Sequence, residues 1–332
     1  MAMPSLAASR LAEGGVALVV NRRAKRVRKG VADPRQLRAL VELHGQAFEP
    51  RSLKELAQVA IEIRSRDPGL VGICGGDGTY QKTLSCLIEA YGDHPLPVVL
   101  PLAGGTFNVL TQALGLRGAA PKMLAKAMKQ VREGRKNGGR GLRTTTIPIL
   151  EITEARSGRR EFAFLFGNGV ISRVIGRYSE GDPSPARAAR VFSEAVGGFM
   201  MQTPAARELV RRHHAKVSID GRDLEDDRFL GILAGTIQPH VLGFTPFVAK
   251  KRLLHNFKYA IGAVEAGQVI GMLPALLRGR LWGTQPGLIN ATARELRIST
   301  DEGYILDGEV YPSGVPRDLV IRVGPRLRFL RP

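Results

Sequence analysis

The sequence has few of the residue types that build disulfide scaffolds, metal centres and aromatic binding surfaces. Cysteine occurs only twice among 332 residues, at Cys74 and Cys86, which excludes a disulfide framework and a four-cysteine metal site. Both cysteines lie in segments that we expect to be buried, so reduced thiols in a cytosolic protein are the simplest interpretation. The six histidines show no metal-ligand spacing, and the single tryptophan is Trp282.

Targeting segments and long apolar runs are also missing. Residues 1–15 lack a signal-peptide pattern, and the first apolar run, Val16–Val20, is too short for a signal sequence. The best membrane-spanning candidate, Tyr259–Leu277, is interrupted by Glu265 and Pro274 and is therefore more typical of a core or interfacial helix. We expect a soluble, cytoplasmic protein that associates with membranes peripherally.

Acidic residues are scarce relative to basic ones. The chain has 30 Asp and Glu against 49 Lys and Arg, which gives a formal net charge of +19. Such a charge suits a polyanionic partner, which can be a nucleic acid, an anionic membrane or a phosphorylated ligand. The hydrophobic content of 44% excludes a disordered chain, and the length predicts about two domains.

The first part of the chain alternates between short apolar runs and helical patterns. Strands are expected at Val16–Val20, Leu70–Cys74 and Leu96–Leu100. Helices are expected over 34–44, over 52–64 with Ser52 as N-cap, over 79–90, and from the glycines near 105 to about 114. This alternation predicts an α/β domain with a parallel sheet that is covered on both faces.

Beyond residue 143 the pattern changes to short strands separated by turn signals, which predicts an antiparallel β-sandwich. The expected strands are Thr144–Ile152, Glu161–Phe166, Lys216–Ile219, Phe229–Ala234, Glu295–Thr300, Tyr304–Leu306 and Leu319–Val323. Helices are expected within it over 185–210 and 262–280, and a glycine-rich linker at 137–141. The predicted domains are therefore 1–143 and 144–332, and the C-terminal segment could return to the first domain.

A glycine-rich corner, Gly75-Gly76-Asp77-Gly78-Thr79, follows the second expected strand and opens a helix. Glycines allow positive φ and a close backbone approach, and the helix N-terminus attracts anions, so the corner suits a phosphate. Asp77 could hold Mg²⁺, directly or through water, or accept a proton from an attacking hydroxyl. The alternative is a plain turn in which Asp77 caps the helix.

A second corner of the same kind, Gly104-Gly105-Thr106-Phe107-Asn108, follows the third expected strand. Thr106 and Asn108 could bind ribose or phosphate, or could simply cap the next helix. Asn21 ends the first strand and should reach the same edge of the sheet, where open α/β sheets bind their ligands.

Two carboxylates flank a turn glycine far along the chain, at Asp307-Gly308-Glu309. On its own this pattern is more often a surface turn than a site. The sequence lacks the standard signatures of the P-loop, the dinucleotide-binding glycine loop, the zinc proteases and the serine hydrolases.

Taken in order, these motifs resemble the diacylglycerol kinase and sphingosine kinase family in its bacterial form, over nearly the whole chain. The family is similar in fold to NAD kinases: a Rossmann-like α/β nucleotide domain and an antiparallel β-sandwich domain, with ATP between them. The resemblance implies ATP- and Mg²⁺-dependent transfer of the γ-phosphoryl group to a hydroxyl of a diacylglycerol-like or related lipid.

The resemblance also assigns roles to residues. It implies that the nucleotide is surrounded by Asn21, Gly75, Gly76, Gly78, Thr79, Gly104, Gly105, Thr106 and Asn108. It makes Asp77 the general base or metal organiser, and it makes Glu309, next to Asp307, a second essential carboxylate from the other domain. Such a division suits phosphoryl transfer, which needs alignment and charge neutralisation more than covalent chemistry.

The sequence departs from the family pattern in three segments. A basic run, Arg22–Arg26, follows Asn21 where the family has a Pro and a Ser-Gly turn. The first sandwich strand has no acid before Glu151, and Lys250–Asn256 replaces an acidic turn that is associated with a structural Mg²⁺. These departures leave the lipid and the structural metal open.

Three functions are consistent with these patterns. A lipid kinase at an anionic membrane is favoured by the motifs and by basic clusters over 22–38, 122–143 and 317–331. A kinase of a soluble substrate, similar to NAD kinase, would need a polar slot, whereas Phe247, Phe257 and the apolar residues 200–201, 244 and 273–277 offer apolar lining or core. A non-catalytic nucleotide-binding protein is the third. No nucleic-acid-binding motif is present, and the oligomeric state stays open.

Overall fold

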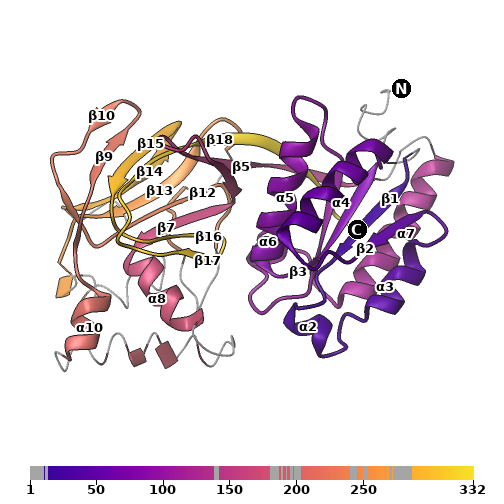
Figure 1. Cartoon of the computed structure of the whole chain (residues 1–332), viewed down its shortest axis with the longest axis horizontal. Coiled ribbons are helices and arrows are strands. Elements are labelled where there is room, and N and C mark those ends of the chain that lie inside the picture. The colour runs from indigo at the N-terminus through magenta and orange to yellow at the C-terminus, as the bar shows by residue number, and fades with distance from the viewer. Residues whose placement is uncertain are drawn as a thin grey trace. The chain divides into compact units, whose positions relative to one another are not determined.

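The computed structural model describes residues 14–137, 142–179, 203–239, 245–249, 253–265 and 286–332, with positions 11, 187, 190, 191, 193, 194, 197, 267, 268 and 271. The chain divides into two compact units (Figure 1). The first contains residues 1–147 and 326–332, and the second contains residues 148–325. Two long strands, β5 (Thr144–Glu154) and β18 (Arg317–Leu330), contribute residues to both units.

The first unit is built on a parallel sheet with the strand order β2-β1-β3-β4. These strands are β1 (Val16–Val20), β2 (Gly45–Phe48), β3 (Leu70–Gly75) and β4 (Val98–Ala103). All three registered pairs among them are parallel, and the end of β18 adds a further parallel strand through Phe329 opposite Val99. The α/β prediction is therefore confirmed, although β2 was missed because its first three residues are not buried.

Strands β1, β3 and β4 are buried over their whole length, because helices cover both faces of this sheet (Figure 1). The helices are α2 (Lys25–Arg28), α3 (Pro34–Val41), α4 (Leu53–Arg66), α5 (Asp77–Tyr91), α6 (Val109–Ala113) and α7 (Ala120–Lys136). Helices α3 and α7 pack together over one core that includes Leu18, Cys74 and Leu100. Helices α4 and α5 contact each other, and α5 contacts β3. Ser52 caps α4 as predicted, accepting from the Glu55 N–H at 3.1 Å.

The two cysteines are both free thiols. Cys74 is fully buried in β3, and burial raises its pKa to about 12, so it remains a neutral thiol at physiological pH. Cys86 is half-buried on α5, and its pKa is also raised by burial. Neither thiol has the lowered pKa of a reactive cysteine.

The second unit is an antiparallel sandwich. One sheet contains β10 (Arg222–Asp223), β9 (Lys216–Ile219), β15 (Glu295–Thr300), β18, β5 and β6 (Arg160–Ala163). The other has the order β14 (Leu288–Ala293), β13 (Phe257–Gly262), β12 (Gly231–Gly235), β7 (Leu165–Gly169), β16 (Tyr304–Leu306) and β17 (Glu309–Tyr311). Residues of both sheets, among them Leu296, Ile321, Phe166 and Phe257, share one buried core, which confirms the predicted sandwich.

Two predicted strands are each divided between elements. The run predicted over Glu161–Phe166 breaks at Phe164, because β6 pairs with β5 whereas β7 pairs with β12 and β16 in the other sheet. The run predicted over Phe229–Ala234 breaks at Leu230, between β11 (Arg228–Phe229) and β12. Strand β11 pairs instead with β8 (His213–His214).

The helix predictions in this unit were less successful. The helix predicted over 262–280 begins wrongly, because Gly262 ends strand β13, and most of the rest lies outside the described residues. Of the helix predicted over 185–210, the structure gives α10 (Pro204–Leu209), while much of 180–202 is also not described. Helix α8 (Val170–Ser179) was not predicted. Among the described residues, the helices are too short or too polar to cross a membrane.

A buried charge network connects α8, α10 and the turn before β16. Glu302, with 5% of its side chain exposed, binds Arg173 of α8 at 2.6 Å. The neighbouring His213 is 1% exposed, and burial lowers its pKa to about 4. Arg173 and Arg211 contribute to that shift, whereas Glu302 opposes it. His213 is therefore neutral in the folded protein at physiological pH.

His213 should couple the stability of the second unit to pH. Its pKa in the unfolded chain is about 6.5, so the unfolded state takes up the proton first as the pH falls. The contribution of His213 to the free energy of unfolding should therefore be complete above about pH 6.5. The free energy of unfolding should fall by roughly 2 kcal/mol between about pH 7 and about pH 5. Urea unfolding at both pH values measures the difference. His213→Leu should flatten it, whereas His255→Gln, an exposed histidine of the same unit, should not; an unchanged slope in His213→Leu would contradict the assignment.

Candidate active site

Three loops meet at the carboxyl edge of the parallel sheet in the first unit. Asn21 follows β1, residues 76–79 follow β3, and residues 104–108 follow β4. Strand β1 lies between β2 and β3. The chain therefore runs from β1 to β2 on one side of β1 and then crosses to β3 on its other side. Open α/β sheets bind their ligands at such a switch point, outside the carboxyl ends of the strands.

The two glycine corners pack backbone against backbone. The Gly104 N–H donates to the Gly75 carbonyl at 2.8 Å. A Cβ atom on Gly105 would lie 2.5 Å from the Gly76 Cα, and one on Gly104 would lie 2.9 Å from the Gly75 Cα. None of these four glycines has a positive φ. The close approach of the two backbones therefore explains why glycine occupies these four positions, and a positive φ does not.

Asn21 joins the end of β1 to the start of α5. Its Nδ2 donates to Thr79 Oγ1 at 2.8 Å, and its Oδ1 accepts from the Arg23 N–H at 2.9 Å. Gly75 lies directly under Thr79, since a Cβ atom there would be 2.4 Å from the Thr79 Cβ. The structure thus brings Asn21, Gly75 and Thr79 together, as the motifs predicted.

Asn108 holds the second corner in shape. It is 4% exposed, lies in the left-handed region with φ of 51°, and precedes α6. Its Oδ1 accepts from the Gly105 N–H and its Nδ2 donates to the Gly105 carbonyl, both at 2.9 Å. The side-chain amide is therefore engaged within the loop, while the half-buried Thr106 lies between these two residues in sequence.

Asp77 lies where two helices begin. It is the first residue of α5, whose N-cap is Gly76, and its Oδ1 accepts from the Leu110 N–H of α6 at 3.3 Å. Asp77 therefore caps a helix, but the helix is α6 and not α5, which was the alternative considered from the sequence. Burial raises the pKa of Asp77, and the backbone N–H groups of Val109, Leu110 and Asn108 oppose the rise. A carboxyl group with a raised pKa in such a place is suited to accept a proton.

Two residues of this edge were not singled out from the sequence. The Arg26 N–H, in the short helix α2, donates to the Gly104 carbonyl at 2.9 Å, so the basic segment packs on the second corner. Tyr80 is buried beneath Asp77, and its hydroxyl donates to the Leu102 carbonyl at 2.8 Å. Burial and the Asp77 charge raise the pKa of Tyr80. The contact of Arg26 is made by its backbone N–H, so the type of its side chain gave no signal for it.

In the second unit, Asp307 and Glu309 have different surroundings. Asp307 and Gly308 form the two-residue turn between β16 and β17, and both have positive φ, as a type I′ hairpin requires. The Asp307 carboxylate accepts from the Phe164 N–H and the Leu165 N–H at 2.9 Å each. Asp307 therefore binds the backbone where β6 passes into β7. Glu309 is exposed at the start of β17.

The segment that forms this site matches a known protein family. Residues 15–138 match the profile of the diacylglycerol kinase catalytic domain. The match contains Asn21, Asp77 and both glycine corners, and it indicates a kinase.

Solved structures with this fold include two crystal structures from Bacillus anthracis strain Sterne. One, a proposed diacylglycerol kinase, shares 15% identity with a TM-score of 0.64 and covers 96% of either chain. The other, described as a diacylglycerol kinase, shares 15% identity with a TM-score of 0.60, over 96% of this chain and 97% of its own. At this identity the likeness establishes the fold. No curated protein matches the chain.

The described residues around Asp77 could bind the phosphates of ATP through backbone N–H groups and Mg²⁺ through the Asp77 carboxylate. The first-turn N–H groups of α5 have no acceptor within the helix, so they are available to phosphate oxygens. Among the described residues, no three His, Cys, Asp or Glu side chains come together as a metal-binding group. One carboxylate together with phosphate oxygens is nevertheless a common way to hold Mg²⁺.

Gly105→Ala should disrupt the catalytic domain locally. The added methyl group would meet the Gly76 Cα at 2.5 Å, so the two corners must separate. We expect unfolding to become easier by about 1–3 kcal/mol and nucleotide affinity to fall. Gly15→Ala is the matched control, because its Cβ would lie at an ordinary 3.5 Å from the His44 carbonyl oxygen. Urea unfolding and calorimetric titration with ATP measure both effects; equal behaviour of the two variants would contradict the packing argument.

Proposed function

We propose that the protein is an ATP-dependent lipid kinase, which transfers the γ-phosphoryl group to a hydroxyl of a diacylglycerol-like or related lipid at the membrane surface. The single observation that carries the proposal is the position of Asp77, which lies in the first glycine corner at the start of α5 and contacts the start of α6, next to the second corner. The family match over residues 15–138 supports it.

The proposed nucleotide site uses the backbone of both corners. Gly75, Gly76, Gly78 and Thr79 bring N–H groups to the phosphates at the positive end of α5. Gly104, Gly105 and Thr106 form the opposite corner, while Asn21 and Asn108 keep the loops in place through the hydrogen bonds described above. Bound Mg²⁺ would neutralise phosphate charge. Asp77 would hold the ion, directly or through water, in the alternative in which it is the metal organiser and not the general base.

Asp77 is the proposed catalytic carboxylate of this domain. As general base, with its pKa raised by burial, Asp77 can accept the proton of the attacking lipid hydroxyl. The hydroxyl oxygen then bonds to the γ-phosphorus while the bond from that phosphorus to the bridging oxygen breaks and ADP leaves. In the second unit, we assign Glu309 as a further essential carboxylate on the strength of the family resemblance, and its exposure leaves it accessible to a substrate. We assign Asp307 a positioning role because its oxygens bind backbone N–H groups.

A cationic helix supports the membrane part of the proposal. One face of α7 is buried through Met123, Leu124 and Ala127. Its other residues include a set of exposed cations: Lys122, Lys126, Lys129, Arg132, Arg135 and Lys136. Basic residues near an anionic lipid surface contribute roughly 1 kcal/mol each, so this helix favours a peripheral contact with such a surface.

The apolar lining expected for a lipid slot is only partly accounted for. Phe257 lies in the main sandwich core, and Phe247 packs in a smaller cluster with Leu233 and Ala260. Both are therefore core residues. Residues 200–201, 244 and 273–277, which the sequence analysis offered as further lining, lie outside the described residues.

Asp77→Asn should abolish phosphoryl transfer without unfolding the protein. The amide oxygen can still accept from the Leu110 N–H, but the proton acceptor is lost, so we expect turnover to fall at least about 100-fold. Asp77→Ala should lose both the activity and the helix cap. The assay uses labelled ATP, Mg²⁺ and a panel of lipids in neutral detergent micelles.

Three outcomes of that assay are informative. Lipid phosphorylation that disappears in Asp77→Asn supports the proposal. Phosphorylation of a soluble acceptor without detergent would replace it with an NAD kinase-like activity. ATP binding without any labelled product, and no difference between the wild type and Asp77→Asn, would indicate a non-catalytic nucleotide-binding protein.

Asp307→Asn and Glu309→Gln should separate structure from catalysis. The amide of Asp307→Asn keeps one accepting oxygen but loses the negative charge that strengthens the bonds from the Phe164 and Leu165 N–H groups. The free energy of unfolding should therefore fall by about 1–2 kcal/mol. Glu309→Gln should keep the wild-type stability and lose turnover. Thermal unfolding and the lipid assay on both variants test this; an active Glu309→Gln enzyme would refute the role of Glu309.

A further inference from the structure

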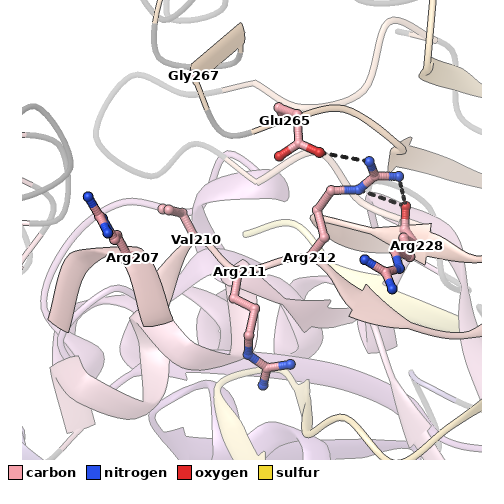
Figure 2. Close-up of a pocket in the computed structure, with 7 residues that line it drawn as sticks. All are labelled: Arg207, Val210, Arg211, Arg212, Arg228, Glu265 and Gly267. Atoms are coloured by element: carbon pink, nitrogen blue, oxygen red, sulfur yellow. Dashed lines mark hydrogen bonds and ion pairs between the residues drawn. The ribbon is translucent and has the colours of Figure 1, made fainter. Parts of the chain in front are cut away.

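The second unit contains a cationic pocket that no part of the proposed mechanism uses (Figure 2). Its volume is about 420 Å³. Its lining residues are Arg207, Val210, Arg211, Arg212, Arg228, Glu265 and Gly267. Four of these seven residues are arginines and one is a glutamate, so their formal charge is +3.

Arg212 organises one side of the pocket. Its Nη1 binds Glu265 Oε1 at 2.9 Å, while its Nε and Nη2 donate to the Arg228 carbonyl at 3.1 and 2.5 Å. Figure 2 shows the Arg212 and Arg228 side chains close together, with Arg207 on the other side of the pocket. Glu265 is 72% exposed, so its carboxylate occupies a position that solvent anions can also reach.

The backbone that carries three of these arginines is anchored from inside the unit. Arg173 Nη1 donates to the carbonyls of Glu208, Leu209 and Arg211, at 3.3, 3.1 and 2.7 Å. These carbonyls lie at the end of α10, where helix carbonyls lack partners within the helix. The Arg173 side chain is 12% exposed and is itself held by the buried Glu302.

The same buried carboxylate also contacts Arg211. Glu302 Oε2 accepts from Arg211 Nη2 at 3.4 Å, and Arg211 Nε binds Glu208 at 3.0 Å. Arg211 is therefore largely neutralised and serves the framework. Arg207 and Arg212 lie close in sequence to these anchored carbonyls, and Arg228 lies in β11, which pairs with β8. The backbone that carries them is therefore already ordered, so little order has to be gained on binding.

We propose that this pocket binds a phosphate group, as a site separate from the nucleotide corners. A guanidinium group matches a phosphate with two parallel N–H bonds, and arginine is favoured for this geometry over lysine. The volume suits a headgroup-sized ligand. None of the seven described lining residues is aromatic, so this described lining offers no stacking surface of the kind that single-stranded nucleic acid uses. The phosphate can come from an anionic lipid headgroup or from a soluble phosphate compound.

The first arm of the test uses inorganic phosphate. Calorimetric or NMR titration of the full chain should detect phosphate binding, and the double variant Arg207→Gln/Arg228→Gln should weaken it at least about tenfold. The matched control, Arg222→Gln/Arg294→Gln, removes the same charge from exposed positions of the same unit and should change affinity by no more than about twofold.

The second arm uses co-sedimentation with vesicles of phosphatidylcholine with and without phosphatidylglycerol. If a lipid headgroup is the source, binding to the anionic vesicles should fall at least about tenfold in the pocket variant and little in the control. If the pocket variant loses affinity only for inorganic phosphate, the source is soluble. Equal affinities of pocket variant and control for both probes would overturn the proposal.

Glu265→Gln provides a test in the opposite direction. Removal of the carboxylate that pairs with Arg212 should strengthen phosphate binding, whereas Glu225→Gln, an exposed position elsewhere in the unit, should not. An effect of the same size in both variants would count against a defined site. The kinase assay in neutral micelles is run separately, so failure of the lipid kinase proposal and failure of this pocket give different results.

Discussion

The contact between the two glycine corners sets the geometry of the catalytic domain. Gly104 donates to Gly75 across the gap between β4 and β3, and Gly105 packs on Gly76 with no room for a side chain. This contact is possible because β3 and β4 are adjacent and parallel, so both corners emerge at the same edge. With the corners so close, Asp77 reaches the start of α6 while it begins α5.

Polar side chains near this edge have a double task. Asn21 and Asn108 use their amides to hold loops, and Asp77 uses one oxygen to cap α6. In the second unit, Asp307 binds the backbone between β6 and β7, whereas the adjacent Glu309 is exposed. Sequence motifs mark all of these residues alike, and the hydrogen bonds distinguish those that build the site from those that are available for chemistry.

Much of the fold could be predicted from the sequence because its strands are apolar and its corners contain glycine. Strands β9, β15 and β16 have the predicted bounds, since turn residues flank each of them. The failures have physical causes. Phe164 and Leu230 lie inside continuous apolar runs, so the change of pairing partner there leaves no local signal. Strand β13 was taken as part of a helix because its five buried residues show no alternation.

The motifs predicted which loops meet at this edge of the sheet, but they did not predict the contacts between those loops. Motif spacing located Asn21, Asp77 and Asn108, yet the packing of Arg26 on Gly104 and the anchoring of the arginine pocket by Glu302 join residues far apart in the chain.

Amide hydrogen exchange with and without Mg·ATP tests most directly whether the two corners form the nucleotide site. The N–H groups of residues 75–79 and 104–108 should become protected together when Mg·ATP binds. Protection elsewhere in the chain, with these two segments unchanged, would contradict the assignment.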